Sequence, residues 1–415
     1  MDDAAGLQQV LVDGLQRTGA LRDQGVEAAF RAVPRHLFLP DTPLEEVYGD
    51  QAIVTKRIDA VGVSSSSQPS VMAIMLEQLA AQPGHRVLEI GAGTGYNAAL
   101  LAHVVGAAGK VVTIDIDADI ARAAQQHLIS AGLEGVEVIC GDGGLGYPLG
   151  APYDRIIVTV GAWDITPAWW EQLCVGGRLV VPLALRGPEI QRAIAFDRMD
   201  DHLASDSVRP CGFMLLRGAF AGPTQQVALG AAGGLRLVHE HAAAVDADAV
   251  FGWLGAPGAS VATGVCANTL DVAGGLNLWL ALHDVRLCAL VAEGNTADSE
   301  RVPPLYGGGQ MRSTVGLLGE RGLALLGWIR EQTPTAEGNG WSPEAPASQL
   351  AVRSFGVDPG ITQALLSHVV GWDTAGRPGG DHLRVRAYRR GVQPAASTAV
   401  QVVEKQWTSL MLEWT

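Results

Sequence analysis

Short apolar segments alternate with helix-like segments between residues 86 and 198, and this alternation constrains the fold more than any other feature. RVLEI (86–90) and KVVTID (110–115) are apolar runs of strand length, and a helix-like segment follows each of them. Four further segments have the composition of strands: 136–140, 154–160, 176–184 and 192–198. Strands that alternate with helices form βαβ units, whose right-handed crossovers give a largely parallel sheet. The sequence therefore predicts an α/β fold with a doubly wound sheet, which binds its ligands at the loops that follow the strands.

The chain also predicts more than one domain, because its 415 residues exceed the usual size of a single domain. A Gly-, Ala- and Pro-rich stretch at 219–234 has the composition of a linker. We therefore expect a first domain at 1–218 and a smaller α+β domain at 235–415. In the second domain, helix-like apolar spacing occurs at 276–294, 319–332 and 361–378, and strand-like segments occur at 382–390 and 403–415.

Composition argues against several classes of function. The formal net charge of −14 gives no basic footprint for nucleic acid or for anionic lipid. No segment approaches the roughly 18 uninterrupted apolar residues of a membrane helix, and the first residues do not have the pattern of a secretory signal. The five cysteines are scattered without a Cys-x-x-Cys, and His239 and His241 lack a third ligand at useful spacing. We expect a cytoplasmic protein with no metal site.

A glycine-rich loop directly follows the strand at 86–90. Gly91, Gly93 and Gly95 let the backbone turn sharply and approach a ligand closely. Their Gly-x-Gly-x-Gly spacing differs from the Gly-x-Gly-x-x-Gly loop that holds a dinucleotide pyrophosphate. Asp115 ends the next strand, where an acid can accept hydrogen bonds from two ribose hydroxyls. The loop thus suits a nucleoside cofactor that lacks phosphates.

A third loop completes this candidate cofactor site. It follows the strand at 136–140, and in it Asp142 can accept from the amine of an adenine while Gly143 lets a backbone N–H approach the ring. The combination of loops resembles class I methyltransferases that use S-adenosylmethionine and release S-adenosylhomocysteine. We assign Glu89, in the strand that leads into the glycine loop, to the same cofactor site.

Several segments, in order along residues 7–218, resemble protein-L-isoaspartate O-methyltransferases. They are VPRHLFLP, SSSSQPSVMAIMLEQL, GHRVLEIGAGTGYNAALLA, GDGGLGYP, YDRIIVTVGA and LCVGGRLVVPL. That family has Thr-Ile-Ser before the Gln-Pro or Ala-Pro that opens the helix, and here Ser65, Ser66 and Ser67 occupy these positions. The resemblance implies that this turn contacts both the cofactor and the substrate carboxylate, while the departure from Thr-Ile makes the pocket more polar and less bulky.

The resemblance also suggests the roles of individual residues. Ser64, Ser65, Ser66 and Ser67 inherit a place in the cofactor site, and we expect Ser67 to orient the substrate carboxylate, with Ser65 as the second candidate. A serine hydroxyl donates a hydrogen bond and brings no charge that would weaken the nucleophile. Thr159 and Gly161 are candidate substrate contacts, with a structural role as the equal alternative, and Arg217 is a third candidate that could reach the substrate or the cofactor. His36 is expected to pack or cap rather than to react.

The second domain favours a special substrate, because repair enzymes of this family are usually about half as long. SSSSQPSVMAIMLEQL, CGFMLLRG and the closing VVEKQWTSLMLEW resemble bacterial homologues encoded beside ribosomally made peptides such as lanthipeptides and graspetides. Those enzymes are understood to esterify an aspartate in a cyclised precursor peptide, and the ester closes to a succinimide that hydrolyses to isoaspartate. We therefore expect an aspartyl O-methyltransferase of this kind.

Three alternatives stay open at this stage. The first is an isoaspartate O-methyltransferase that repairs damaged proteins and carries an accessory domain. The second is a cofactor-binding scaffold whose second domain recognises a peptide. The third is an NAD-dependent oxidoreductase, which the spacing of the glycine loop disfavours.

Overall fold

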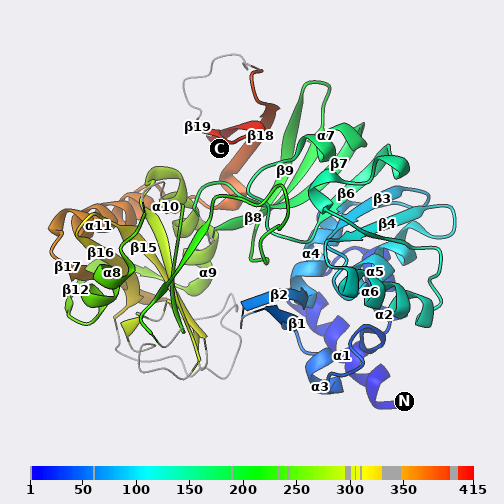
Figure 1. The fold of residues 1–415 in the computed structure, drawn as a ribbon, viewed down its shortest axis with the longest axis horizontal. Coiled ribbons are helices and arrows are strands. Elements are labelled where there is room, and N and C mark those ends of the chain that lie inside the picture. Colours follow the sequence, from blue (N-terminus) through cyan, green and yellow to red (C-terminus); the bar gives the residue numbers. More distant parts are fainter. Residues whose placement is uncertain are drawn as a thin grey trace. The chain divides into compact units, whose positions relative to one another are not determined.

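The structure is a computed structural model that describes residues 2–58, 61–187, 190–231, 234–240, 244–294, 301–303, 305–308, 311–329, 347–392 and 401–415 (Figure 1). His241 of the sequence HEH lies outside the described residues. The chain forms two compact units. The first unit contains Met1–Leu183, Arg192–Gly222 and Arg384–Glu413, and the second contains Ala184–Gln191, Pro223–Leu383 and Trp414–Thr415.

A ten-stranded sheet organises the first unit, in the order β19-β20-β18-β9-β8-β7-β6-β3-β4-β5. Its parallel part consists of β3 (Arg86–Ile90), β4 (Lys110–Asp115), β5 (Glu137–Cys140), β6 (Tyr153–Val158) and β7 (Leu173–Ala184). β3 lies between β4 and β6, so the strand order reverses beside it. In an open parallel sheet such a reversal leaves a crevice at the carboxyl ends of the strands, where ligands bind.

Helices connect the parallel strands as the alternation in the sequence predicts. They are α5 (Tyr96–Val105), α6 (Ala118–Ser130) and α7 (Pro167–Gln172), and α4 (Pro69–Leu79) precedes β3. Pro69 occupies the first turn of α4, where its missing N–H costs nothing. The N-terminal region adds α1 (Asp2–Arg17), α2 (Gln24–Ala32), the 3₁₀ helix η1 (Arg35–Phe38) and α3 (Leu44–Val47), whose apolar faces complete the core beside α4 and α5. Two further 3₁₀ turns are η2 (Gly143–Leu145) and η3 (Pro148–Gly150).

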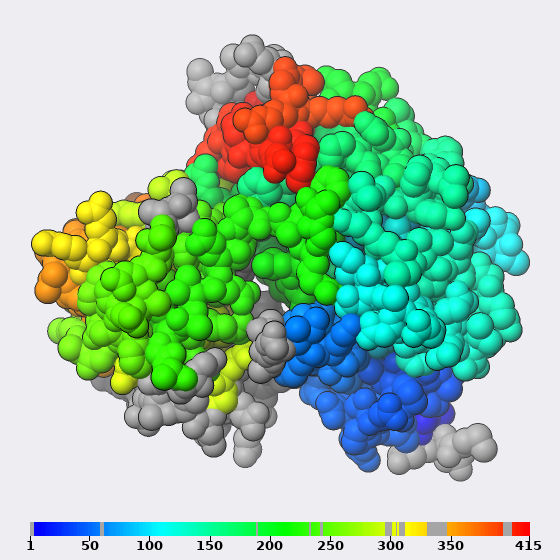
Figure 2. All heavy atoms as spheres, viewed as in Figure 1, coloured from blue at the N-terminus to red at the C-terminus, as the bar shows by residue number. Residues whose placement is uncertain are grey.

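The antiparallel part of this sheet departs from the predicted domain boundary. β8 (Gln191–Arg198) and β9 (His202–Cys211) extend the sheet beyond β7, and β18 (Leu383–Arg389) then pairs antiparallel with β9. The hairpin of β19 (Gln401–Glu404) and β20 (Thr408–Trp414) forms its far edge. In Figure 2 the orange and red spheres mark the C-terminal strands, and Arg384–Glu413 belongs to the first unit. The predicted second domain at 235–415 therefore includes a C-terminal part that belongs to the first unit.

A buried carboxylate anchors this C-terminal hairpin within the first unit. Asp164 follows β6 and is 2% exposed. Its carboxylate accepts hydrogen bonds from the Thr408 hydroxyl and from the N–H of Trp407, at 2.7 Å. The ring of Trp407 also packs on Phe220, with the ring centroids 4.9 Å apart. Side chains of the last strands thereby support the loops that follow the central strands.

An antiparallel sheet forms the centre of the second unit, which is an α+β structure. The strand order is β10-β11-β13-β15-β16-β17-β12, and β14 pairs with β15. The strands are β10 (Gln225–Leu229), β11 (Leu235–His239), β12 (Pro257–Ala267), β13 (Leu287–Glu293), β14 (Tyr306–Gly308), β15 (Met311–Leu318), β16 (Gly322–Trp328) and β17 (Ser348–Gly356). The helices are α8 (Ala247–Leu254), α9 (Thr269–Asp271), the π-helical turn η4 (Val272–Leu276), α10 (Asn277–His283), α11 (Pro359–Thr374) and the 3₁₀ turn η6 (Gly380–His382).

Three local predictions for this unit are wrong. The helix predicted at 276–294 is interrupted, because α10 ends at His283 and the rest forms β13. The segment predicted as helical at 319–332 contains strand β16, which is buried on both faces and therefore lacks the alternation that marks a strand. The predicted linker at 219–234 contains strand β10, which pairs with β11. In the described part of the chain, no helix has the length and apolar character that a membrane span requires.

Candidate active site

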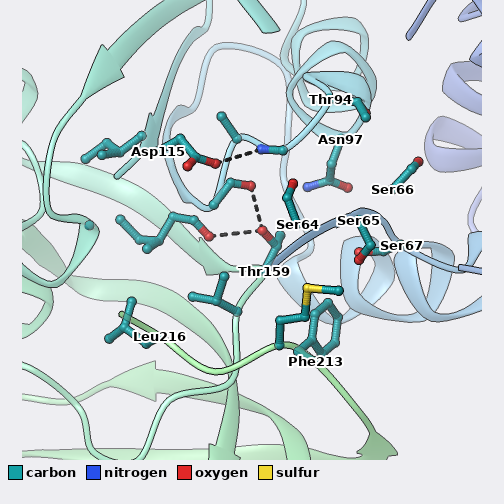
Figure 3. Close-up of a pocket in the computed structure, with 18 of the residues that line it drawn as sticks. Ser64, Ser65, Ser66, Ser67, Thr94, Asn97, Asp115, Thr159, Phe213 and Leu216 are labelled. Carbon is teal, nitrogen blue, oxygen red and sulfur yellow. Dashed lines mark hydrogen bonds between the residues drawn. The ribbon is translucent and has the colours of Figure 1, made fainter. Parts of the chain in front are cut away.

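A pocket lies in the first unit at the reversal of strand order (Figure 3). The pocket opens to solvent, and about 990 Å³ of space lies within it when the solvent at its mouth is included. It is lined by the residues that follow β3, β4 and β6, by the turn of serines, and by residues 213–217. The turn belongs to a separate two-stranded hairpin of β1 (Ile53–Ile58) and β2 (Val61–Ser66). The structure thus brings the polyserine turn and the glycine-rich loop to one pocket.

The glycine loop adopts backbone conformations that favour glycine. Gly91, Gly93 and Gly95 have φ angles of 101°, 52° and 88°, and side chains rarely tolerate such values. A Cβ at position 91 would lie 2.6 Å from the Thr159 hydroxyl oxygen, and one at position 93 would lie 3.4 Å from the carbonyl oxygen of Ser65. Glycine at positions 91 and 93 therefore leaves the space between this loop and the pocket residues Thr159 and Ser65 free of a side chain. Gly95 is the N-cap residue of α5.

Asp115 lies at the carboxyl end of β4 and holds the same loop. One carboxylate oxygen accepts from the N–H of Gly93 at 3.0 Å, and the other accepts from the N–H of Asp117 at 3.1 Å. Burial raises the pKa of Asp115, and these two N–H groups oppose that shift. Each oxygen keeps a lone pair for a further donor. The carboxylate can therefore hold the loop and still accept hydrogen bonds from a ligand.

The turn of serines presents alternate hydroxyls to opposite sides. Ser64 and Ser66 are 8% and 3% exposed, and their hydroxyls accept from Thr55 at 3.1 Å and from Arg35 at 3.2 Å. Ser65 and Ser67 are half-buried, and no described protein group hydrogen-bonds their hydroxyls. In Figure 3 the Ser65 and Ser67 side chains project to the same side of the segment, while Ser66 points away from them. Two neighbouring hydroxyls are thus available to a bound molecule.

Thr159 uses its hydroxyl on the glycine loop. It donates toward the carbonyl oxygens of Gly91 at 2.8 Å and Ile90 at 3.0 Å (Figure 3). The residue is still among those that line the pocket. Thr159 therefore has a structural role that competes with the predicted substrate contact, because its hydroxyl already hydrogen-bonds the backbone at the end of β3.

Comparisons with known proteins agree with this geometry. A family model described as protein-L-isoaspartate(D-aspartate) O-methyltransferase matches residues 7–219. The chain belongs to this family. The enzyme is thus a carboxyl O-methyltransferase that depends on S-adenosylmethionine. The family match ends before residue 223, where the longest segment of the second unit begins.

Individual relatives of the methyltransferase carry the same description. A protein-L-isoaspartate O-methyltransferase of Thermotoga maritima is 41% identical over 182 residues, which are 44% of this chain and 57% of that protein. One from Methanoregula boonei is 40% identical over 200 residues, 48% of this chain and 88% of that protein. A solved protein-L-isoaspartate O-methyltransferase aligns over 91% of this chain and 96% of its own, with 24% identity and a TM-score of 0.49.

The pocket of the methyltransferase fits S-adenosylmethionine in its donor set and its shape. Asp115 has lone pairs for ribose hydroxyls, and the positions of Gly91 and Gly93 form a cradle that side chains would fill. Gly143 also lines the pocket, and a Cβ there would lie 2.5 Å from Ile90 Cγ2. The lining includes apolar side chains beside Asp115, such as Ile116, that suit a flat base.

Two predicted cofactor residues of the methyltransferase, Glu89 and Asp142, are not among the residues that line this pocket. Glu89 is fully buried, and its carboxylate accepts from the Asn97 amide at 2.7 Å and from the Thr113 hydroxyl at 2.6 Å. Burial raises the pKa of Glu89 to about 7, against the effect of both hydrogen bonds. Asp142 accepts from the N–H groups of Gly144 at 2.9 Å and Ala219 at 2.8 Å. Glu89 therefore orients Asn97, which does line the pocket, and Asp142 shapes the loop that contains Gly143.

Charged residues at the pocket are largely paired with one another. Arg217 lines the pocket, but its guanidinium binds the carboxylate of Asp117 at 2.8 Å. Lys56 of the β1–β2 hairpin binds the same carboxylate at 3.0 Å and that of Asp119 at 2.8 Å. These contacts lower the pKa of Asp117. Asp117 and Asp119 lie at the start of α6, so these ion pairs connect the β1–β2 hairpin to that helix.

Gly161 connects the loop after β6 to the strip of residues 213–217. Its N–H donates to the carbonyl of Met214, and its carbonyl accepts from the N–H of Leu216, both at 2.8 Å. These two backbone hydrogen bonds hold the strip in place, and Phe213 and Met214 of the strip line the pocket. Sequence reasoning missed Phe213, Met214 and Asn97 as lining residues. In the motif CGFMLLRG the sequence favoured Arg217 as a site residue. The apolar residues that precede Arg217 in this motif also line the pocket.

Proposed function

We propose that the methyltransferase esterifies a peptide carboxylate, and that its substrate is an L-isoaspartyl residue. The observation that supports this most directly is the pair of hydroxyls of Ser65 and Ser67, which face the pocket behind the glycine loop. When bound, S-adenosylmethionine supplies a methyl group on a positively charged sulfur. The residues proposed to hold it are Asp115, the glycine loop, Gly143 and the carbonyl of Ser65, with Ser64 and Ser66 supporting the turn.

The substrate carboxylate needs no general base, because a carboxyl group with a pKa near 3–4 is ionised at neutral pH. The lining of the pocket agrees with such a nucleophile. Among its described residues, the ionisable side chains are Tyr96, Asp115 and Arg217, and burial raises the pKa of Tyr96. Asp115 is bound by two N–H groups and Arg217 by Asp117. We therefore assign the residues of the site to alignment and exclusion of water rather than to proton transfer.

Ser67 is the proposed orienting donor, with Ser65 as the second candidate. A hydroxyl that donates to one carboxylate oxygen fixes the direction of the other and leaves the negative charge intact. Phe213 and Met214 form the apolar side of the slot and keep water from the carboxylate. Thr159, Gly161 and Arg217 are proposed to shape the substrate side through the contacts described above, and Arg217 acts through Asp117.

The experiment compares Ser67→Ala, Ser65→Ala and the control Ser130→Ala, whose side chain is exposed at the end of α6. A hydrogen bond to a charged group contributes about 1.5–3 kcal/mol, so Ser67→Ala should lower kcat roughly ten- to hundredfold on an isoaspartyl peptide. Binding of S-adenosylhomocysteine should stay within about twofold. Unchanged kcat in both pocket variants would refute the assignment of the serines.

A second candidate function is esterification of an aspartate in a cyclised ribosomal precursor peptide. Sequence reasoning placed it first, whereas the relatives named above favour isoaspartate. What still favours it is the extra unit at 223–383, together with the serines at 65 and 66 in place of Thr-Ile. We propose that this unit selects the peptide and that the reaction takes place in the cytoplasm, in keeping with five cysteines that form no disulfide.

A substrate panel separates the two candidates. Linear isoaspartyl peptides, their aspartyl counterparts and a cyclised precursor peptide are incubated with the methyl donor, and esters are detected by mass spectrometry. Turnover of linear isoaspartyl peptides without turnover of aspartyl peptides supports the first proposal. Esterification of aspartate in the cyclised peptide alone would overturn it in favour of the second.

A further inference from the structure

A buried arginine lies directly behind the turn of serines. Arg35, the first residue of η1, is 0% exposed. Its Nη1 donates to the carbonyls of Val47 at 2.9 Å and Gly49 at 3.3 Å. Its Nη2 donates to the Ser66 hydroxyl at 3.2 Å and to the carbonyl of Ser67 at 3.0 Å. One guanidinium therefore connects the N-terminal region to both residues that precede Gln68.

The charge of Arg35 is not neutralised by an ion pair with any carboxylate in the described part of the chain. Its Nε has no hydrogen-bond partner there, and the ring of Tyr96 lies 5.9 Å from the guanidinium carbon. Burial lowers the pKa of Arg35, against the influence of Tyr96 and Asp50. A buried charge without a counterion destabilises a folded protein by several kcal/mol unless something else compensates it.

We propose that Arg35 is a positioning residue that holds the Ser67 turn and whose positive charge draws the substrate carboxylate into the slot. The substrate carboxylate then acts, beside Asp50, as a further negative partner of Arg35 from the other side of the turn. This inference rests on the proposed function, because it takes the carboxylate to bind at Ser67.

The position of Arg35 behind the wall suits a nucleophile. A guanidinium in direct contact would form a bidentate pair with the carboxylate and would hold both of its oxygens. From behind Ser66 and Ser67, the positive charge still attracts the anion, but the contact with the nucleophile is left to a neutral hydroxyl. Two other cations in the described part of this region, Lys56 and Arg217, are bound to Asp117. Arg35 is therefore the cation best placed to favour a carboxylate over a neutral group.

The test measures discrimination between a carboxylate and a carboxamide at the same position. The probes are an isoaspartyl peptide and its isoasparaginyl analogue, each titrated into the full-length enzyme saturated with S-adenosylhomocysteine. At an effective dielectric constant of about 20, an opposite charge about 8 Å away changes binding roughly thirtyfold. Arg35→Gln should therefore reduce the carboxylate preference by about this factor, and Arg35→Lys should retain most of it while losing part of kcat.

The control variant is Arg155→Gln, in which another arginine with a burial-lowered pKa is changed near the amino end of β6, away from the carboxyl ends of the strands that border the pocket. Its carboxylate preference should equal that of the wild type, whatever its stability. If Arg35→Gln is folded and keeps the full preference, Arg35 acts only structurally and the inference is wrong. If the wild-type enzyme binds neither peptide, the proposed isoaspartyl substrate is wrong and the inference falls with it.

Discussion

The hydroxyl of Thr159 offers a decisive test of the cofactor loop. It donates toward the carbonyls of Gly91 and Ile90, and the Ile90 carbonyl also accepts from the backbone N–H of Thr159 at 2.8 Å. In Thr159→Val, which has the same shape, the Ile90 carbonyl therefore keeps a partner, whereas the Gly91 carbonyl loses its own. An unsatisfied buried carbonyl costs about 1–3 kcal/mol. In the ligand-free enzyme, water in the pocket can hydrate this carbonyl, so most of the cost should arise when the cofactor displaces that water.

The assay is calorimetric titration with S-adenosylhomocysteine. Thr159→Val should weaken binding roughly five- to hundredfold, which corresponds to the same 1–3 kcal/mol. The melting temperature without ligand should fall by no more than about 2–4 °C, as expected for about 1 kcal/mol in a domain of this size. Thr159→Ser restores the hydroxyl and should bind within about threefold of the wild type. If Thr159→Val instead binds the cofactor normally and only raises the KM of the peptide, then Thr159 contacts substrate as the sequence suggests, and the structural reasoning is refuted.

Three further predictions concern buried groups. Because burial raises the pKa of Glu89 from 4.5 to about 7, its contribution to stability is present below pH 4.5 and is lost as the pH rises through about 7; urea unfolding should show this loss relative to Glu89→Gln, and parallel pH profiles would contradict it. Gly143→Ala places a Cβ 2.5 Å from Ile90 Cγ2, so cofactor affinity should drop at least tenfold in the same titration, roughly the effect of 1–3 kcal/mol of strain; unchanged affinity would argue against Gly143 in the site. Asp164→Ala leaves the Thr408 hydroxyl and two N–H groups without their acceptor, so the free energy of unfolding should fall by about 3 kcal/mol; a loss below about 1 kcal/mol would show that the C-terminal hairpin docks without this anchor.

The parallel half of the first sheet could be predicted because its signals are local. Each strand from 86–90 to 176–184 is an apolar run bounded by turn residues, and β3 and β4 have the predicted bounds. The same alternation predicts that the glycine loop and Asp115 lie close together, because parallel strands place their carboxyl ends at one edge of the sheet. The position of the pocket was therefore available from the sequence.

The antiparallel extension could not be predicted because its pairing is long-range. Arg386 pairs with Ala204 across about 180 positions of sequence, and no periodicity within β18 indicates which strand it joins. The segment of β16 illustrates a second limit, because GLALLGW is buried on both faces and so resembles a buried helix as much as a strand.

The roles of several side chains at the site also could not be predicted from the sequence. Arg217 and Asp117 are 100 positions apart, and only the fold shows that they neutralise each other. Arg35 belongs to the motif VPRHLFLP, in which sequence reasoning considered only the neighbouring His36. His36 hydrogen-bonds the Tyr48 hydroxyl at 2.7 Å, in keeping with the packing role expected for it.

The return of the chain to its first sheet has a consequence for how the protein is made. During translation the strands that surround the pocket leave the ribosome early, but β18, β19 and β20 emerge only after residues 223–383 have been synthesised. Until then, the edge of β9 that pairs with β18 is free, and the Asp164 carboxylate has no Thr408 hydroxyl from which to accept a hydrogen bond. A nascent chain therefore cannot complete its catalytic unit before the other unit exists, and a prematurely terminated product would expose an open strand edge that invites aggregation.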